Sequence, residues 1–404
     1  MEVKEGYRQT EVGVIPEDWR VFPVTKVTSE IFLGLTSKVD YVTHGGIPLV
    51  RATDIADGNL SFSKVRNISI EQHKSLTKYR KAKRGDVLVS KSGSLGVCAL
   101  VDVDHEFSIY ESIIVLQTKP MLHPEFLLWL LRDERTQIRM IGEKVGSSVA
   151  HLNIEMFRKL VIQIPTLTEQ TAIITAISDA EALIQSMEKL IVKKRSIMQG
   201  ALQELLKPKV GWVVKKLSEV SEIKRGASPR PINSPIWFDE KSRVSWVRIS
   251  DVTRSVKFLN RTSQKLSESG IKHSRFVSRN SLIMSICATV GRPILTKIDV
   301  CIHDGFVVFA NLKIETEYLY YFLISIEKEW SKNGQTGSQM NLNTGIIDSQ
   351  IITYPIEKLE QTRIATIFSD IDNEIAALEI KLIKYKQIKQ GMMQTLLTGR
   401  IRLI

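Results

Sequence analysis

The chain has 404 residues, which is enough for two or three domains of roughly 150 residues each. Apolar residues make up 43% and charged residues 25%, a globular composition that excludes wholesale disorder. Lys and Arg outnumber Asp and Glu by 56 to 44, and the net charge of +12 favours an anionic partner, either nucleic acid or a membrane surface.

The sequence also argues against membrane-spanning and disulfide-rich proteins. Apolar runs such as FLLWLL at 126–131 are far shorter than the roughly 20 residues that a span needs, and the charged N-terminus has no apolar signal region. Cys98, Cys287 and Cys301 lack the Cys-x-x-Cys spacing of a zinc site and the even number of a disulfide framework. We therefore expect a soluble, cytoplasmic protein with reduced thiols.

The first predicted domain spans residues 1–165. Short β-branched runs (VLVS, IIVLQT and LVIQIP) alternate with turns rich in Gly, Ser, Asn and Asp, and one short helix is expected around 124–141. This pattern predicts a mixed α/β domain.

A long helix follows in a predicted spacer segment, residues 166–207. From 173 to 205, steps of four and three residues alternate, and nine of the ten positions reached are apolar, with Lys194 as the exception. A period of 3.5 residues indicates a two-helix coiled coil. Pro165 and Pro208 bracket this helix.

The second half of the chain repeats the first. Residues 360–397 align without a gap on residues 169–206, and 16 of 38 positions are identical. Lys389 is the exception in the second apolar seam. This indicates a tandem duplication. Weaker matches join LVRATDI at 49–55 to WVRISDV at 246–252, and HLN at 151–153 to NLN at 341–343. The duplication predicts a second mixed α/β domain at 208–356, with one short helix around 316–332, and a second spacer helix with a tail at 357–404.

We expect the two long helices to pair with each other in antiparallel directions, because this returns the tail to the first domain. The predicted fold class is α+β, with two mixed α/β domains in tandem, separated by two long antiparallel helices that form a coiled coil. Such a chain is pseudo-two-fold and quasi-circular. The alternative is two unrelated amphipathic helices, each packed on its own domain.

The positive charge lies outside the long helices. Residues 167–206 carry four basic and five acidic residues and residues 357–397 carry six of each, so the rest of the chain carries +13. Basic residues there stand beside Gly, Ser and Thr, as in KRGASPR, SKSGS and KYRKAKR, a mixture that suits phosphate contacts. Two basic domains on a stiff rod fit a bipartite, asymmetric DNA site. A generally solvated basic surface is the alternative.

Motifs of catalysis are absent from the sequence. There is no G-x-x-x-x-G-K-S/T phosphate loop and no H-E-x-x-H zinc motif. We interpret DVDHEF at 102–107 as a polar turn, and Glu222 with Lys224 lacks the acidic partner that a nuclease would need. We therefore expect a binding protein without catalytic, cofactor-binding or metal-binding residues.

The layout resembles one known family, the specificity subunits of type I restriction-modification systems. The resemblance covers nearly the whole chain, and it is carried by GYRQTEVGVIPEDW, IPTLTEQTAI, GDVLVSxxGSxG at 85–96, LEQTRIATIFSDID and the closing LLTGRIRL. The second copy departs from the glycine motif, with Asn280 in place of the first glycine and Ala288-Thr289 in place of Gly93-Ser94. This argues against a shared base-contacting role for that loop.

The resemblance implies that each mixed domain is a target recognition domain, which reads one half of a split DNA sequence. The helices would be the spacer and the platform for two modification subunits, which would use S-adenosylmethionine to methylate one adenine in each half-site. Restriction subunits would add translocation and cleavage that depend on ATP and magnesium. All chemistry would then lie in partner chains, with no cofactor in this one.

Candidate readers follow from the chemistry of the major groove, where Arg or Lys suits guanine and Asn or Gln suits adenine. The candidate DNA-binding residues are Lys91, Ser92, Ser94, Ser147, Ser148, His151 and Asn153 in the first domain, and Lys224, Arg225, Ser228, Arg230, Gln335, Ser338, Gln339 and Asn341 in the second. For each of them a turn or capping role is the alternative. Arg51 with Asp54, and Arg248 with Asp251, recur in both copies and are interpreted as internal pairs, because domains with different targets should not share their readers.

Two other functional classes stay open. A coiled-coil protein-interaction scaffold with nonspecific DNA affinity leaves the charge of the two domains unexplained. A stand-alone nuclease or methyltransferase would require turnover by the isolated chain. The target sequence and the length of its spacer do not follow from the sequence.

Overall fold

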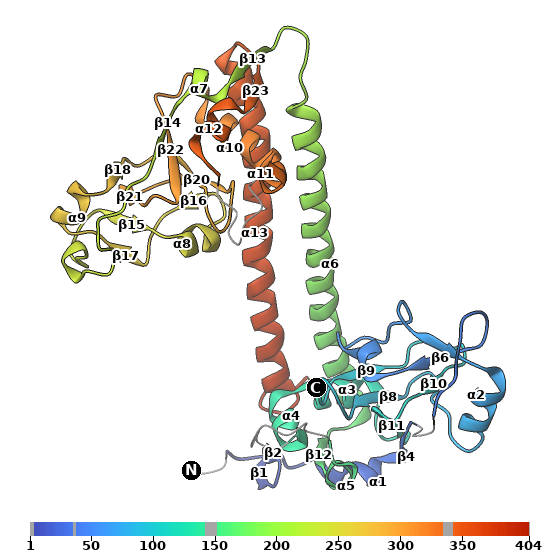
Figure 1. Ribbon diagram of the computed structural model, residues 1–404. Coiled ribbons are helices and arrows are strands. Elements are labelled where there is room, and N and C mark those ends of the chain that lie inside the picture. Colours follow the sequence, from blue (N-terminus) through green and yellow to red (C-terminus); the bar gives the residue numbers. More distant parts are fainter. Residues whose placement is uncertain (1–3, 35–37, 142–151, 334–341, 404) are drawn as a thin grey trace. The chain divides into compact units, whose positions relative to one another are not determined.

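The computed structural model describes residues 4–34, 38–141, 152–333 and 342–403 (Figure 1). The chain forms two compact units. Unit 1 comprises residues 1–187 and 381–404, and unit 2 comprises residues 188–380. The unit boundaries therefore run through the two long helices, so that each unit contains one mixed α/β domain and part of each helix.

Unit 1 is built around an antiparallel sheet with the strand order β4-β11-β8-β9. Val87 and Val89 pack into the core on one face of this sheet, and Leu88 packs into a second core on the other. Because both faces are covered, VLVS and IIVLQT are continuous apolar runs instead of alternating ones. A second sheet has the order β10-β6-β7-β5, and β1-β2 and β12-β3 form pairs.

The elements of unit 1 are β1 (Tyr7–Thr10), β2 (Gly13–Pro16), β3 (Arg20–Pro23), α1 (Val24–Val27), β4 (Thr28–Leu33), β5 (Tyr41–Val42), β6 (Ile47–Val50), the 3-10 helix η1 (Ala52–Ile55), β7 (Arg66–Ile68), α2 (Ile70–Thr77), β8 (Val87–Ser90), β9 (Cys98–Leu100), β10 (Ser108–Ile109), β11 (Ile113–Thr118), α3 (Pro124–Arg132), α4 (Glu134–Ile141), α5 (Ile154–Arg158) and β12 (Val161–Ile164). The long helix α6 (Leu167–Leu205) follows and passes into unit 2.

Unit 2 repeats this plan with a main sheet of order β14-β22-β19-β20-β16, a second sheet of order β17-β15-β21-β18 and the pair β13-β23. Its elements are β13 (Val213–Lys216), α7 (Leu217–Val220), β14 (Glu222–Arg225), η2 (Pro235–Trp237), β15 (Ser245–Val247), α8 (Ile249–Arg254), β16 (Phe258–Leu259), β17 (Gln264–Lys265), α9 (Glu268–Lys272), β18 (Arg275–Val277), β19 (Leu282–Ser285), β20 (Pro293–Thr296), β21 (Val300–Ile302), β22 (Phe306–Ala310), α10 (Thr316–Ser325), α11 (Glu327–Asn333), α12 (Thr344–Ser349), β23 (Ile351–Tyr354) and the long helix α13 (Lys358–Leu396), which passes back into unit 1.

The same close crossing of two backbone segments occurs in both domains, and each crossing requires a glycine. Gly34 follows β4 and lies against the carbonyl oxygen of Tyr110, and Gly226 follows β14 and lies against that of His303. A Cβ atom at either glycine would overlap the carbonyl group. Tyr110 and His303 therefore occupy equivalent places, and the predicted tandem of mixed α/β domains is confirmed.

The short helices differ from the prediction. The single helix expected around 124–141 is the pair α3 and α4, and the one around 316–332 is the pair α10 and α11. The break falls at Asp133, which is extended (ψ 136°) and whose carboxylate accepts a hydrogen bond from the N–H of Arg135 in the first turn of α4. The sequence also missed brief helices such as α2, which starts with a cap on Ser69.

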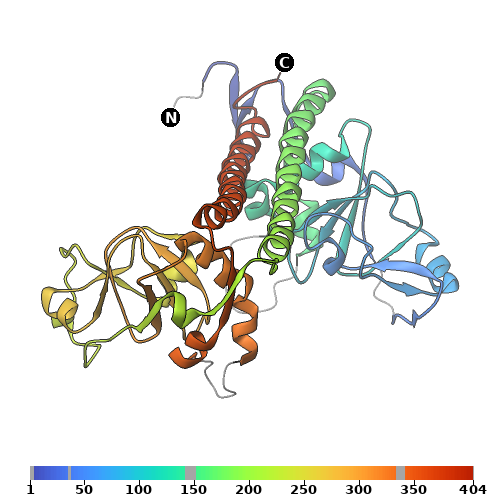
Figure 2. The same ribbon diagram turned by 90° about the horizontal axis from the view of Figure 1, so that it is seen from above.

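The predicted pairing of the long helices is confirmed within each unit. Every predicted seam position of α6 and α13 is buried or half-buried. In unit 1, Lys389 Nζ of α13 lies 2.5 Å from Glu181 Oε2 of α6, and in unit 2 Lys194 of α6 forms an ion pair with Glu374 of α13. These two lysines are the exceptions in the apolar seams. The early part of each helix faces the late part of the other, so the pairing is antiparallel (Figure 2).

A turn with positive φ recurs in both domains, at Gly93 (φ 77°) and at Ala288 (φ 57°). The left-handed conformation costs a residue with a Cβ atom about 1–2 kcal/mol. We expect Ala288→Gly to raise the free energy of unfolding of unit 2 by about 0.5–1 kcal/mol, because the greater freedom of Gly in the unfolded chain offsets part of the relief. Hydrogen exchange of unit 2 amides measures the change.

Gly93→Ala is the matched reverse change in unit 1, since a Cβ atom there would meet no other atom within 4 Å. We expect it to lower the stability of unit 1 by a similar amount. If Ala288→Gly left unit 2 unchanged or less stable, the turn would not be strained.

Candidate nucleic-acid interface

The turn between β8 and β9 carries three candidate readers, Lys91, Ser92 and Ser94. The hydroxyl of Ser90 donates to the carbonyl of Ser94 and so closes the turn, and the equivalent Ser285 hydroxyl closes the turn after β19 in unit 2. Ser94 is exposed, whereas Lys91 and Ser92 are half-buried. The turn has a defined shape, but a base-contacting role for these three side chains stays a prediction.

The structure brings the candidate Asn153 next to this turn, because the N–H of Leu152 donates to the carbonyl of Lys91 at 2.9 Å. Asn153 Oδ1 accepts the N–H of Glu155 at 2.9 Å and caps α5, and Asn343 Oδ1 accepts that of Ile346 at 2.9 Å and caps α12. A buried leucine followed by a cap therefore explains the match between HLN and NLN. The candidates that lie outside the described residues are Ser147, Ser148, His151, Gln335, Ser338, Gln339 and Asn341.

In unit 2, three candidates meet at Asp304, a residue that the sequence did not indicate. Its main-chain oxygen accepts a hydrogen bond from Arg225 Nε at 2.8 Å, and its carboxylate accepts one from Ser228 Oγ at 2.6 Å. Arg230 Nη2 lies 3.4 Å from the same carboxylate. The hydrogen bond from Ser228 holds the pKa of Asp304 below its usual value, so the group is ionised at neutral pH. The fourth candidate of this segment, Lys224, instead pairs with Glu222 at 2.6 Å.

A cavity of about 520 Å³ lies beside Asp304, and its lining includes Arg230, Arg248, Trp246 and His303. Burial lowers the pKa of His303, so its ring is neutral at pH 7. Its Nδ1 accepts the N–H of Gly305 at 2.9 Å, which leaves the proton on Nε2. The cavity thus combines two guanidinium groups, one carboxylate and a neutral imidazole.

The recurrent Asp residues have a structural role in both domains. Asp54 accepts the main-chain N–H of Arg51 at 2.8 Å, and Asp251 accepts that of Arg248 at 3.0 Å, so each carboxylate caps a short helix. The guanidinium of Arg51 also lies 3.7 Å from Asp54. In unit 2 the expected side-chain pair is replaced, because Arg248 Nε donates to Gln264 at 2.5 Å.

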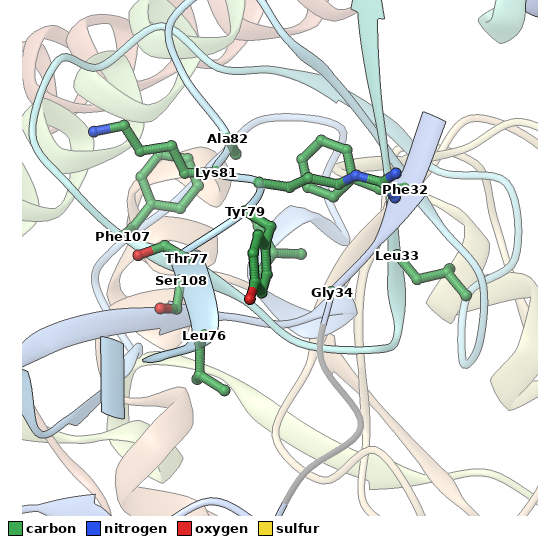
Figure 3. A pocket seen from close by; sticks show the side chains of 12 residues that line it. Phe32, Leu33, Gly34, Leu76, Thr77, Tyr79, Lys81, Ala82, Phe107 and Ser108 are labelled. Atoms are coloured by element: carbon green, nitrogen blue, oxygen red, sulfur yellow. The ribbon is translucent and has the colours of Figure 1, made fainter. Parts of the chain in front are cut away.

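In unit 1 a cavity of about 540 Å³ lies between the end of β4 and the segment that follows α2. Figure 3 shows Tyr79 in the middle of this pocket, with Phe32 and Phe107 on opposite sides of it in the view. Tyr79 is 85% exposed, and Lys78 Nζ lies 5.1 Å from its ring centre. An exposed aromatic ring next to a cation suits a base or sugar surface.

Several cations of the KYRKAKR cluster have protein partners. Ion pairs join Arg80 to Glu30 (3.3 Å), Lys81 to Glu106 (3.1 Å) and Arg84 to Asp104 (2.7 Å). The DVDHEF turn therefore supplies counter-charges.

Across residues 4–34, 38–141, 152–333 and 342–403, no group of His, Cys, Asp and Glu side chains is arranged to hold a metal ion. None of the helices in this part of the chain is long and apolar enough to cross a membrane.

Comparison with known proteins agrees with the duplicated frame. The sequence matches the family described as "Type I restriction modification DNA specificity domain" twice, over residues 16–193 and 209–386. The chain belongs to this family as a specificity subunit. Two relatives from Methanocaldococcus jannaschii match over nearly their whole length. The putative type I restriction enzyme MjaX specificity subunit is 26% identical, over 99% of this chain and 97% of the relative, and the MjaVIII specificity subunit is 23% identical, over 99% and 96%.

Solved structures show the same fold for specificity subunits. The type I restriction-modification S subunit from M. genitalium is 13% identical to this chain, covers 98% of both chains and gives a TM-score of 0.59. A second solved chain comes from a study of complex assembly and conformational transition of the type I R-M system. It is 19% identical, the match covers 96% of this chain and 99% of that one, and the TM-score is 0.60. The predicted fold class, two mixed α/β domains in tandem with two long antiparallel helices, is confirmed.

Proposed function

We propose that this specificity subunit reads a bipartite, asymmetric DNA target, with one half-site for each mixed α/β domain, and performs no chemistry itself. The observation that carries the proposal is one specificity domain present twice on a common frame, with different side chains at equivalent places. Tyr110 and Glu111 in unit 1 stand where unit 2 has His303 and Asp304. A common frame gives both domains the same approach to DNA, and different side chains give them different base preferences.

The proposed partners are double-stranded DNA, two modification subunits and the restriction subunits. Exposed apolar side chains on the long helices, including Val192, Ile380 and Ile383, support a docking role. Gly200 and Gly391 support it too, because a Cβ atom at either would meet nothing beyond the backbone of its own helix within 4 Å, so the surface there is open. In this proposal, S-adenosylmethionine, ATP and magnesium bind to the partner subunits.

A methylation map tests the proposal. The chain is co-expressed with its modification subunit in a host that lacks the system, and modified adenines are read across the genome. We expect one split motif that disappears when this chain is omitted. A complex that forms, yet neither methylates nor binds DNA in a salt-dependent manner, would leave a protein-interaction scaffold instead.

A length change in the long helices tests their role as a ruler. Inserting four residues at matched places in both helices is expected to lengthen the unread spacer by about two base pairs, since four residues add about 6 Å and one base pair occupies about 3.4 Å. Both half-site sequences should stay the same, because the reading residues are untouched. The methylation map of the variant measures both properties. Altered half-sites with an unaltered spacer would show that the helices do not set the distance.

A further inference from the structure

One arginine of unit 2 contacts a carboxylate while most of its side chain stays exposed to solvent. Arg230 Nη2 lies 3.4 Å from Asp304 Oδ2, and 76% of the Arg230 side chain is exposed. Asp304 is itself fixed by Ser228, whose hydroxyl donates to Oδ1 at 2.6 Å. A guanidinium has five N–H donors, and only Nη2 contacts the carboxylate, so other donors are left for a ligand.

The surroundings of Arg230 suit a polar, electron-rich ligand. The cavity of about 520 Å³ that it lines also includes Arg248, Asn233 and Ser250. Two arginines against the single carboxylate of Asp304 make the lining positive overall. Base edges and phosphates are the DNA groups that such a lining can accept.

Comparing the two copies shows which residues their shared backbone fold requires and which residues are free to differ. The glycine crossing is the same in both domains. At the ends of the equivalent strands β4 and β14, however, unit 1 has the apolar Leu33 and unit 2 has Arg225. Unit 1 has Glu111 where unit 2 has Asp304, and Lys38 where unit 2 has Arg230. Both domains thus have a cation and a carboxylate at these positions, but only unit 2 has the planar guanidinium of an arginine.

We propose that Arg230, positioned by Asp304, is a specificity-determining residue that reads a guanine in the major groove of the half-site bound by unit 2. Guanine presents two acceptors there, N7 and O6, and the planar fork of an arginine matches both. A carboxylate that already orients the guanidinium reduces the entropy lost on binding. This inference rests on the proposed function, because its ligand is double-stranded DNA.

The test uses the full chain in complex with its modification subunits, together with duplexes that carry the mapped target or single base-pair substitutions. Arg230→Ala is expected to weaken binding of the target about 5- to 150-fold. It should also abolish the preference for guanine at one position of one half-site and leave the other positions unchanged. Arg230→Lys keeps the charge without the fork, so we expect it to lose the same preference while the salt dependence stays the same.

Arg254→Ala is the matched control, because Arg254 is an exposed arginine of the same domain that does not line the cavity. It should leave the base preferences intact. Asp304→Asn should weaken the preference at the position that Arg230→Ala affects, since an amide holds the guanidinium less firmly than a carboxylate.

Four results would overturn the inference. Arg230→Ala could weaken binding of every duplex alike and lower the salt slope by about one, which indicates a phosphate contact. It could alter a position that is not a guanine, or leave discrimination intact. Asp304→Asn could affect a different position from Arg230→Ala. Failure of the proposed function would look different, because the unsubstituted complex itself would not distinguish its target from other duplexes.

Discussion

Replacing Lys257 by Met is expected to lower the free energy of unfolding of unit 2 by about 2–4 kcal/mol, because it leaves a half-buried carboxylate without its cation. The buried Lys257 Nζ donates to Glu317 Oε2 at 2.7 Å, to Ser369 Oγ at 2.8 Å and to the hydroxyl of Tyr321 at 3.0 Å. Glu317 and Tyr321 belong to α10 and Ser369 belongs to α13. The lysine therefore ties the mixed α/β domain of unit 2 to its long helix.

Native-state hydrogen exchange is the appropriate measurement, because a chain of two units need not unfold in one step. Lys265→Met on the exposed side of β17 is the matched control, with an expected change within about 0.5 kcal/mol. Adding Glu317→Gln to Lys257→Met should restore part of the loss. Unchanged protection of α10 in Lys257→Met would show that this cluster does not hold the helix.

Acid should weaken the same cluster. Although burial opposes ionisation, hydrogen bonds from Lys257 and Ser369 hold the pKa of Glu317 below its usual value. Its contribution to stability is therefore complete above the unfolded pKa of about 4.3, and it is lost as the pH falls through the folded value.

Arg402→Ala is expected to lower the free energy of unfolding of unit 1 by about 3 kcal/mol. Arg402 Nε and Nη2 lie 2.5 and 2.8 Å from the two carboxylate oxygens of Glu169, whose side chain is fully buried. The same guanidinium donates to both oxygens of Asp18 at 3.0 and 2.8 Å. After the substitution, Glu169 would retain the indole N–H of Trp19 at 3.0 Å but no cation.

The same tail supplies a close control for Arg402→Ala. Arg400 lies two residues earlier and is exposed, so Arg400→Ala should change stability by less than about 0.5 kcal/mol. Faster exchange of amides in β1, β2 and the start of α6 should accompany Arg402→Ala alone, and Glu169→Gln should recover part of its loss. Equal effects of the two arginine substitutions would contradict a specific stabilising role for the ion pair between Arg402 and Glu169.

The long helices could be predicted because one property, the apolar seam, decides both their period and their partner. The repeated Glu-Gln-Thr at their entries has an equally local cause. Gln170 accepts the N–H of His123 at 2.9 Å and donates to the carbonyl of Pro165, and Gln361 does the same with Glu315 at 2.8 Å and with Pro355. Each buried amide thus joins the start of a helix to its domain, which explains the identical residues in the two copies.

The cluster around Asp304 could not be predicted from spacing, because Ser228 and Asp304 are 76 positions apart. Only the pairing of β14 with β22 brings them together. The sequence offered one signal for Asp304, the alignment of IHDGF at 302–306 with IYESI at 109–113. An alignment of the two copies does not show which residues are in contact. Asn153 shows a different limit of sequence analysis. A polar residue just before a helix can be a helix cap or a DNA-contacting residue, and the sequence does not distinguish the two roles. In the structure, the Oδ1 atom of Asn153 is used by the cap.

The assignment of helix segments to the two units has a consequence for the order of folding during synthesis. Unit 2 is one continuous stretch, residues 188–380, whereas unit 1 needs residues 381–404, which are made after it. At about 5–20 residues per second, the first half of α6 waits roughly 10–40 s for its partner. The N-terminal unit is thus the last to be completed, and its unpaired apolar seam is exposed on the nascent chain for that time.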